Sequence, residues 1–503
     1  MKKTKLTLLK TGCALLVVVA TSLTLPAQVL STLASFNGFD GGDPYYGPLV
    51  QGLDGNFYGT TSSGGANCVP YGCGTVFKAT PDGAITTLYS FCAEDYCPDG
   101  AYPYAGLLLA SDGNFYGTTT EGGTDIHGGT VFKITPAGKL TTLYGFCAQT
   151  NCADGNYPTA PLIQGGDGNF YGTTFSGGIG DAQYCQGGCG TVFKITPKGV
   201  ATILHSFVGY NLEGSGPTAC LVQGPDGSFY GTTTNGGAYD ACTLGCGTVF
   251  KITPKGVMKT LHSFAGSPND AAQPFGGLTL GSNGILYGTA SAGGTADNGT
   301  VFKITAAGTL TTVYNFCTQP NCVDGGQPEA GVVLATDGNL YGTAARGGTY
   351  VIGSIFKITP SDVFTTLYSF CSQGFPSCPD GSFLYAGLIQ ATSGKFYGST
   401  FEGGDSTCGS GYGCGTVFSF DMGLGPFVSF VRDSAKVGQA FDILGQGLSG
   451  TTGVSLNDVA CDFAIKSDKL IVASVPEDAA TGYVDVITPN GTLKSNEPLH
   501  VIP

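Results

Sequence analysis

The chain has 503 residues, of which 84 are glycine, 42% are hydrophobic and 11% are charged, and its formal net charge is −14. Intrinsic disorder requires low hydrophobicity and high charge, so this composition excludes it. The acidic balance predicts no nucleic-acid partner, because such partners need a basic surface. Abundant glycine with Thr, Tyr, Phe and Val is typical of short strands joined by tight turns. We therefore predict an all-β protein.

Residues 1–27 predict a secretory signal peptide. Four lysines precede an apolar segment that runs from Ala14 to Leu25, which is the layout of such a peptide. We expect cleavage near Ala27. The apolar segment is too short for a membrane span of about 20 residues. The prediction is a secreted or cell-surface protein with no membrane span after signal removal.

One motif then recurs along most of the chain. It reads D-G-N-F-Y-G-T-T at Asp112–Thr119. The tyrosines of its seven copies are Tyr58, Tyr116, Tyr171, Tyr230, Tyr287, Tyr341 and Tyr397. A nearly constant period of this order signals a solenoid, a propeller or an array.

Each repeat contains four strand-like runs. In the second repeat these are Ala105–Ala110, Asn114–Thr120, Gly129–Thr135 and Lys139–Phe146. The first and second runs, and the third and fourth, are joined by short turns containing Asp-Gly or Pro-Ala-Gly. The other connections are longer and vary in length. Four antiparallel strands repeated radially form the blades of a β-propeller.

The strand count predicts how the ring closes. Seven third strands occur, but a fourth strand follows only six of them. The missing strand is found at the start, where Val29–Phe36 resembles the other fourth strands. We expect this segment to complete the last blade and so remove an open sheet edge. Residues 28–424 are therefore predicted to form a seven-bladed β-propeller.

Sixteen of the 19 cysteines form close pairs in the long connections. In an exported chain such pairs predict disulfides. Metal binding is the alternative, but each pair would need further ligands and the four histidines do not accompany the pairs. The predicted disulfides are Cys68–Cys73, Cys92–Cys97, Cys147–Cys152, Cys185–Cys189, Cys242–Cys246, Cys317–Cys322, Cys371–Cys378 and Cys408–Cys414. Cys220 and Cys461 are expected to be free, and Cys220 to be a buried, inert thiol.

The repeats resemble a known family. The run G-N-F-Y-G-T-T, the pair Gly122-Gly123 and the run G-T-V-F-K-I-T-P look like the GloVer (Gloeobacter/Verrucomicrobium-type) tandem repeat over residues 29–422. The resemblance implies a secreted bacterial protein, often attached to the surface by a C-terminal anchor, with no established activity. It implies a setting and no particular reaction.

Residues 425–503 differ from the repeats. They carry G-Q-G-L-S-G at Gly445–Gly450, V-P-E-D-A at Val475–Ala479 and alternating apolar residues at Tyr483–Ile487. This segment resembles the IPT/TIG immunoglobulin-like module, which implies a small β-sandwich that serves as a spacer or interaction unit.

The alternation of strand direction places all long connections on one face of the ring, where binding is usual in repeat proteins. Tyrosines in these loops are candidates for contacting a ligand: Tyr71, Tyr102, Tyr157, Tyr184 and Tyr412. Asp-Gly pairs recur there and are turn signals or weak Ca²⁺ candidates: Asp40, Asp99, Asp154, Asp324 and Asp380. His205 and His262 occupy a fourth-strand position that elsewhere holds tyrosine, so we interpret them as structural.

Catalytic chemistry has no evident residue set. No Ser-His-Asp arrangement, metal-ligand cluster or phosphate-binding glycine motif is recognisable, and no cofactor is predicted apart from the Ca²⁺ alternative. The sequence favours a secreted binding or adhesion protein whose ligand is an extracellular glycan or protein. One alternative is a polysaccharide hydrolase or lyase that uses loop carboxylates, and another is a structural envelope protein. The loop carboxylates are Glu121, Asp125, Asp181, Glu213, Asp240 and Glu402.

Overall fold

The computed structural model describes residues 28–68, 72–180, 185, 187–209, 213–408 and 411–502. The predicted signal peptide lies outside the described residues. The described part is all-β, and its helical segments are two three-residue turns, Thr150–Cys152 and Pro320–Cys322. Among the described residues there is no helix of the length and hydropathy that a membrane crossing requires.

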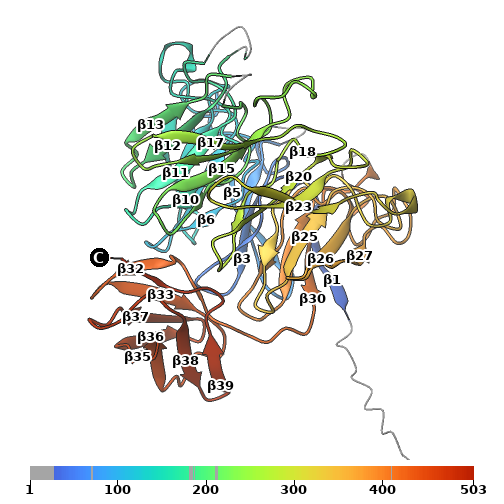
Figure 1. Cartoon of the computed structure of the whole chain (residues 1–503). Helices are drawn as coiled ribbons and strands as arrows, with labels where there is room; N and C mark the ends of the chain where they lie inside the picture. Colours follow the sequence, from blue (N-terminus) through green and yellow to red (C-terminus); the bar gives the residue numbers. More distant parts are fainter. Residues whose placement is uncertain are drawn as a thin grey trace, which may run out of the picture.

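Seven successive four-stranded antiparallel sheets span residues 29–421 of the described chain (Figure 1). Their first strands are β2 (Val50–Gln51), β6 (Leu108–Leu109), β10 (Ile163–Gln164), β14 (Val222–Gln223), β19 (Thr279–Leu280), β24 (Val333–Leu334) and β28 (Ile389–Gln390). The second strands are β3 (Phe57–Thr61), β7 (Phe115–Thr119), β11 (Phe170–Thr174), β15 (Phe229–Thr233), β20 (Leu286–Ala290), β25 (Leu340–Ala344) and β29 (Phe396–Thr400).

The third strands are β4 (Thr75–Ala79), β8 (Thr130–Ile134), β12 (Thr191–Ile195), β16 (Thr248–Ile252), β22 (Thr300–Ile304), β26 (Ser354–Ile358) and β30 (Thr416–Asp421). The fourth strands are β5 (Ile85–Ser90), β9 (Leu140–Gly145), β13 (Ala201–Ser206), β17 (Met258–Ser263), β23 (Leu310–Asn315), β27 (Phe364–Ser369) and β1 (Val29–Ser35). A short pair, β18 (Ala271–Ala272) with β21 (Ala292–Gly293), lies beside the fifth sheet.

The ends of the array meet as the sequence predicts. Strand β1 pairs antiparallel with β30, from Val29 opposite Asp421 to Ser35 opposite Thr416. The seventh sheet also packs on the first, because the rings of Phe57 and Tyr397 stack with centroids 3.9 Å apart. The array is therefore a closed, propeller-like ring in which the N-terminal strand completes the last sheet.

The repeated motif is explained residue by residue in its second copy. The Tyr116 hydroxyl donates to Asp112 in the preceding turn at 2.9 Å, while its ring packs 4.1 Å from Phe170 of the next sheet. A Cβ at Gly117 would lie 2.6 Å from the Phe132 ring, so glycine lets that ring into the core. The two threonine hydroxyls bond the next sheet at Ala160 O and the third strand at Thr130. The motif thus holds each sheet together and joins it to its neighbour.

The first strands are shorter than predicted. The second repeat was expected to have a strand over Ala105–Ala110, but β6 covers Leu108–Leu109. The preceding residues approach the neighbouring sheets instead: Thr60 Oγ1 donates to Ala105 O at 2.7 Å and Tyr46 N donates to Tyr104 O at 3.1 Å. These entry segments therefore pack against each other at the centre of the ring.

The C-terminal segment forms two further four-stranded sheets. One contains β31 (Ser429–Phe430), β33 (Ala440–Leu444), β37 (Leu470–Ser474) and β36 (Phe463–Ser467). The other contains β35 (Val459–Ala460), β34 (Gly453–Leu456), β38 (Val484–Thr488) and β39 (Gly491–Lys494). Strand β32 (Ser434–Lys436) pairs in parallel with β40 (His500–Ile502). A single apolar cluster that includes Ile443, Ile471 and Val486 lies between the sheets.

This C-terminal unit packs against the tight turns of the ring (Figure 1). Leu53, in the first turn, lies in one apolar cluster with Val431, Leu444 and Leu470. Phe427 N also donates to Thr392 O in the corresponding turn of the seventh sheet, at 3.1 Å. The turn face of the ring is therefore partly covered, whereas the long loops lie on the opposite face.

Candidate functional site

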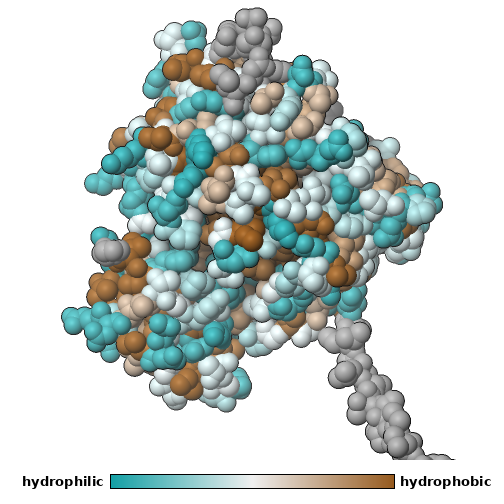
Figure 2. All heavy atoms as spheres, in the orientation of Figure 1, coloured by the Kyte–Doolittle hydropathy of each residue, from teal (hydrophilic) through white to brown (hydrophobic). Residues whose placement is uncertain are grey.

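The loop face carries all eight disulfides of the described chain. They join the predicted cysteines, with partners four to seven residues apart, and each lies in a connection after a second or a fourth strand. Cys220 and Cys461 are free. Hydrophobic side chains appear in small separate groups on the face shown in Figure 2. The disulfide rings restrain the long loops and so stiffen the loop face.

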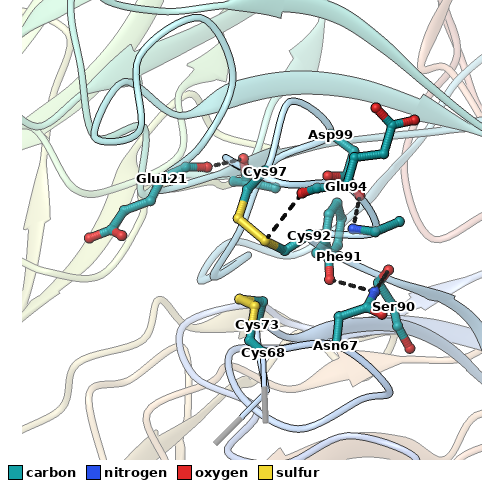
Figure 3. Close-up of a disulfide and its surroundings, with 12 residues drawn as sticks. Asn67, Cys68, Cys73, Ser90, Phe91, Cys92, Glu94, Cys97, Asp99 and Glu121 are labelled. Atoms are coloured by element: carbon teal, nitrogen blue, oxygen red, sulfur yellow. Dashed lines mark hydrogen bonds between the residues drawn. A yellow bond between two sulfur atoms is a disulfide. The ribbon is translucent and has the colours of Figure 1, made fainter.

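Two disulfides lie next to each other in the first repeat. The sulfur atoms of Cys68, Cys73, Cys92 and Cys97 all lie within 4.8 Å of one another (Figure 3). This is the arrangement of two pairs that a metal site would need. Each of the four sulfurs is bonded in a disulfide, Cys68–Cys73 or Cys92–Cys97. Disulfide sulfurs are not thiolate ligands, so the structure favours the covalent role.

The recurring aspartates hold the loops that follow the fourth strands. In the second repeat the Tyr144 hydroxyl donates to Asp154 Oδ2 at 2.7 Å, and Ala148 N and Gln149 N donate to the same carboxylate at 3.1 Å. The same tyrosine–aspartate bond joins Tyr89 to Asp99, Tyr314 to Asp324 and Tyr368 to Asp380. These four carboxylates belong to four separate loops. Their hydrogen bonds account for their recurrence without a shared ion.

Histidines replace tyrosine in two repeats. His205 Nε2 lies 3.0 Å from Glu213 Oε2, and His262 Nε2 lies 2.9 Å from Asp270 Oδ2. Although burial opposes it, hydrogen bonds from His262 and from two backbone N–H groups lower the pKa of Asp270. The pairs His205–Glu213 and His262–Asp270 therefore hold the loop after the fourth strand in the same way as the tyrosine–aspartate pairs.

Asp40 differs from the other four aspartates. The equivalent fourth-strand position in β1 is Ala34, which faces Val417 and has no hydroxyl to donate. Asn37 N donates to Asp40 Oδ1 at 2.9 Å, and burial raises the pKa of Asp40. The seventh sheet thus lacks the side-chain bond of the other six.

At one equivalent position on the loop face, every repeat has a left-handed backbone. Tyr102 (φ 55°) and Tyr157 (φ 53°), both predicted ligand-face residues, hold this position in the second and third repeats. The complete set is Asp43, Tyr102, Tyr157, Gly216, Gln273, Gln327 and Phe383. Positive φ favours glycine, yet six of the seven residues have side chains. Backbone bonds fix them from both sides, as in Tyr102 N to Cys73 O and Thr120 N to Tyr102 O. The backbone is constant while the side chain changes.

Two positions after each left-handed residue, the chain enters the first strand of its sheet. The residues at this position converge at the centre of the ring. They are Tyr104, Thr159, Thr218, Phe275, Glu329 and Tyr385, with both Tyr45 and Tyr46 in the first repeat, which is one residue longer here. We call Tyr45, Tyr46, Tyr104, Phe275, Glu329 and Tyr385 the central cluster. All six are half-buried.

Ring contacts define the central cluster. Tyr45 lies between the neighbouring repeats, with centroids 5.2 Å from both Tyr104 and Tyr385. Tyr46 reaches across the ring to Phe275 of the fifth repeat, with centroids 6.3 Å apart and planes 11° apart. Phe401 lies at the edge, 5.1 Å from Tyr45. The cluster is therefore a continuous aromatic surface at the axis of the loop face.

Glu329 is the acidic group inside this surface. Burial raises its pKa to about 7, against weaker opposing effects of a Tyr46 hydrogen bond and of Arg346. Burial, the hydrogen bond with Tyr45 and the negative charge of Glu329 all raise the pKa of Tyr46. Burial and the same carboxylate raise the pKa of Tyr385 to about 12. The carboxyl group can thus change its charge near neutral pH.

Other charges surround the central cluster. Arg346 is exposed and lies 5.4 Å from the ring centroid of Phe383. Burial and the nearby Asp43 raise the pKa of Glu402. Burial raises the pKa of Tyr104, and Tyr45 and the charge of Glu121 raise it further. Carboxylates therefore outnumber cationic groups around the aromatic surface.

The remaining predicted residues lie elsewhere. Tyr412 is 46% exposed and its ring stacks on Phe375 with centroids 5.2 Å apart, in the outer loops. Tyr71, Tyr184 and Asp181 are outside the described residues. Cys220 is only partly buried, which corrects the expected buried thiol. Its Sγ occupies the space that a Cβ at Gly277 would take. Cys220 lies just before the first strand of its sheet, which has no further strand of the described chain on its inner side. Burial nevertheless raises the pKa of this thiol.

Sequence reasoning missed the central cluster although a signal existed. The residue directly after the Pro or Leu that precedes each first strand changes from Tyr to Thr, Phe or Glu, while its neighbours repeat. Departure from a repeat marks a position that the shared fold does not require. The clue was obscured because Tyr45, Tyr104 and Tyr385 look like ordinary repeated aromatics.

These observations define an all-β, propeller-like tandem-repeat protein with a disulfide-rich loop face. The model of the Gloeobacter/Verrucomicrobia repeat matches residues 18–244 and 181–418. The chain belongs to this family, as its motifs indicated.

No curated protein matches the chain. Among solved structures, a protein of unknown function from Bacteroides thetaiotaomicron is 15% identical with a TM-score of 0.39, over 78% of this chain and 76% of that one. A putative 6-phosphogluconolactonase from Bacteroides uniformis is 18% identical with a TM-score of 0.41, over 64% and 83% of the two chains. At these scores the likenesses carry no inference about activity.

Proposed function

We propose that the protein is a secreted or cell-surface binding protein. In this proposal residues 28–424 form a seven-bladed β-propeller that holds an extracellular ligand, a glycan or a protein, on the loop face. Residues 425–503 form an immunoglobulin-like module of the IPT/TIG type, which supports the propeller from its turn face. The N-terminal 27 residues direct export.

One observation carries the proposal. At equivalent positions on the loop face, a constant and partly strained backbone carries five different residue types in the seven repeats: Asp, Tyr, Gly, Gln and Phe. Strained backbone that the surrounding structure over-determines is typical of functional sites. Packing within the repeats would favour the same side chain in every copy, so the variation supports selection for a ligand.

Two further features agree with this role. Eight loop disulfides are typical of proteins in oxidising compartments outside the cytosol. Loops that are rigid before binding lose less entropy when a ligand binds. The packing of Leu53 against the C-terminal unit leaves the loop face as the free face of the ring.

A glycan array probed with the full chain, together with an assay for released reducing sugar, tests the proposal. We expect retention on particular glycans without sugar release. Tyr385→Ala should weaken retention, whereas Tyr96→Ala, which changes an exposed tyrosine in an outer loop, should not. Sugar release without retention would contradict the binding role and favour a hydrolase or lyase. Concentration-dependent self-association without any ligand would instead favour a structural envelope role.

A further inference from the structure

The central cluster combines aromatic surface with a carboxyl group that has no ion pair among the described residues. Glu329 interacts with Tyr46 and Tyr385, and the ring of Tyr46 also contacts that of Phe275. These three aromatic residues come from three different repeats. The charges of Glu329 and Glu402 both act on Tyr385, and the guanidinium of Arg346 opposes them. No cation of the described residues forms an ion pair with Glu329 within 4.0 Å.

This combination discriminates between classes of ligand. An anion would meet carboxylates on several sides, and its burial there would be unfavourable. A neutral ligand would cover Glu329 without supplying the opposite charge that a buried carboxylate needs. A metal ion such as Ca²⁺ takes six to eight oxygen ligands, and aromatic rings cannot supply them. An organic cation satisfies both features, since the ring faces attract it and the carboxylate neutralises it.

We propose that the central cluster binds an organic ammonium group, held against the faces of Tyr46, Phe275 and Tyr385 and neutralised by Glu329. The proposal rests on the loop face being the binding face and names the chemistry recognised there. Arg346 is the competing internal cation, because it is the positive group acting on both Glu329 and Tyr385. The ammonium group can be quaternary, as in choline, or primary, as in an amino sugar.

Titration calorimetry with matched ligand pairs tests this recognition on the full chain. One pair is choline and its uncharged carbon analogue dimethylbutanol, and the other is glucosamine and N-acetylglucosamine. The charged member of at least one pair should bind at least about tenfold more tightly, as expected for one charge-assisted contact. The pair that shows the difference identifies the source of the ammonium group. Equal affinity within both pairs, or no binding of either charged member, overturns the proposal.

Substitutions at two charged residues should act in opposite directions. Glu329→Gln keeps the shape of the side chain and should abolish the preference for the charged ligand. Arg346→Gln removes the competing cation and should tighten binding of that ligand about threefold. Asp95→Asn changes an exposed carboxylate in an outer loop and should have no effect. Unfolding temperatures of all variants confirm that each is folded. Equal losses for Glu329→Gln and Asp95→Asn would overturn the assignment.

The pH dependence provides a second readout. Ionisable groups that act on Glu329 are Tyr46 and Arg346, and Glu329 in turn acts on Tyr385. Only Glu329 among these changes charge near neutrality. Affinity for choline, whose own charge does not depend on pH, should therefore rise from pH 5.5 to about pH 8 in the wild type and stay flat in Glu329→Gln. If glycans are retained on the array without any ammonium preference, the ligand class is wrong while the binding function stands. If nothing binds the loop face, both fail.

Discussion

Glu329 places a carboxyl group where the other repeats place tyrosine, threonine or phenylalanine. Its neighbours are aromatic rings and its nearest opposing charge belongs to an exposed arginine, so burial dominates and the pKa rises to about 7. One side chain therefore gives the axis of the ring a charge that depends on pH. The repeats alone, with their lysines and aspartates paired on the surface, would not provide it.

The raised pKa has a consequence for stability. The folded state favours the protonated form of Glu329, so this contribution is complete below the unfolded pKa of 4.5 and is lost as the pH rises through about 7. The loss is at most about 3.5 kcal/mol, since one pKa unit corresponds to roughly 1.4 kcal/mol. We expect the wild-type chain to lose more stability between pH 4.5 and 8 than Glu329→Gln, as measured by urea unfolding. Identical pH profiles of the two proteins would contradict the buried carboxyl group, and Asp95→Asn serves as the control.

Within a single loop, one side-chain bond ties the end of the fourth strand to the disulfide ring. Asp154 is buried and accepts hydrogen bonds from Tyr144 and from two backbone N–H groups. The bond recurs with tyrosine or histidine as donor in six of the seven repeats. The disulfides and these bonds together make the long loops extensions of the sheets.

Tyr144→Phe tests the contribution of this bond. The substitution leaves the ring in place and removes one donor to a buried carboxylate, which should destabilise the chain by about 1–3 kcal/mol. The loop between Cys147 and Cys152 should also be cut sooner by proteases. Tyr96→Phe removes an exposed hydroxyl and is the control. An unfolding curve for Tyr144→Phe that matches this control would rule out a structural role for the bond.

Strand β1 has a different role, because it closes the ring. It supplies the outer partner of β30, which would otherwise have an open edge. A chain lacking residues 28–36 should unfold in a single transition at a lower temperature, because every sheet depends on its two neighbours. Adding a synthetic peptide of residues 28–36 should restore part of the loss. Calorimetry that detects only local loosening of the seventh sheet would argue against a closed, cooperative ring.

At the scale of the whole molecule, the two faces of the ring have different partners. The turn face packs against the C-terminal unit, and the loop face presents the central cluster. Leu53 illustrates the division, because the equivalent turn residue of the fifth repeat is the exposed Ser282. A leucine occurs in the turn that the C-terminal apolar residues cover.

Leu53→Asp should separate the two units. A buried charge next to Val431, Leu444 and Leu470 is unfavourable without a partner, so the C-terminal unit should detach while each unit stays folded. Small-angle scattering should show a larger radius of gyration, and the linker near residue 425 should become sensitive to proteases. Ser282→Asp changes an exposed, uncovered turn and is the control. Unchanged scattering for Leu53→Asp would show that this contact does not hold the units together.

Features that depend on local pattern were predictable from the amino-acid sequence. The period of the Tyr-Gly motif, the turn residues and the short separation within each cysteine pair predicted four strands per repeat, the pairing of β1 with β30 and all eight disulfides. These features follow because a repeat that packs on copies of itself must use the same residues each time. The length of the first strands was overestimated, since entry segments such as Ala105 bond a neighbouring sheet rather than their own.

Features that depend on closing the ring became visible only in the folded chain. Tyr46 and Phe275 are far apart in sequence, and they meet because residues of the first and fifth repeats face each other across the axis. The environment of Glu329 is likewise assembled from several repeats, so no local pattern reveals its raised pKa. The docking of Leu53 depends on how the C-terminal unit sits on the ring. Contacts between distant repeats arise from the circular arrangement, and a linear reading of the chain does not contain that geometry.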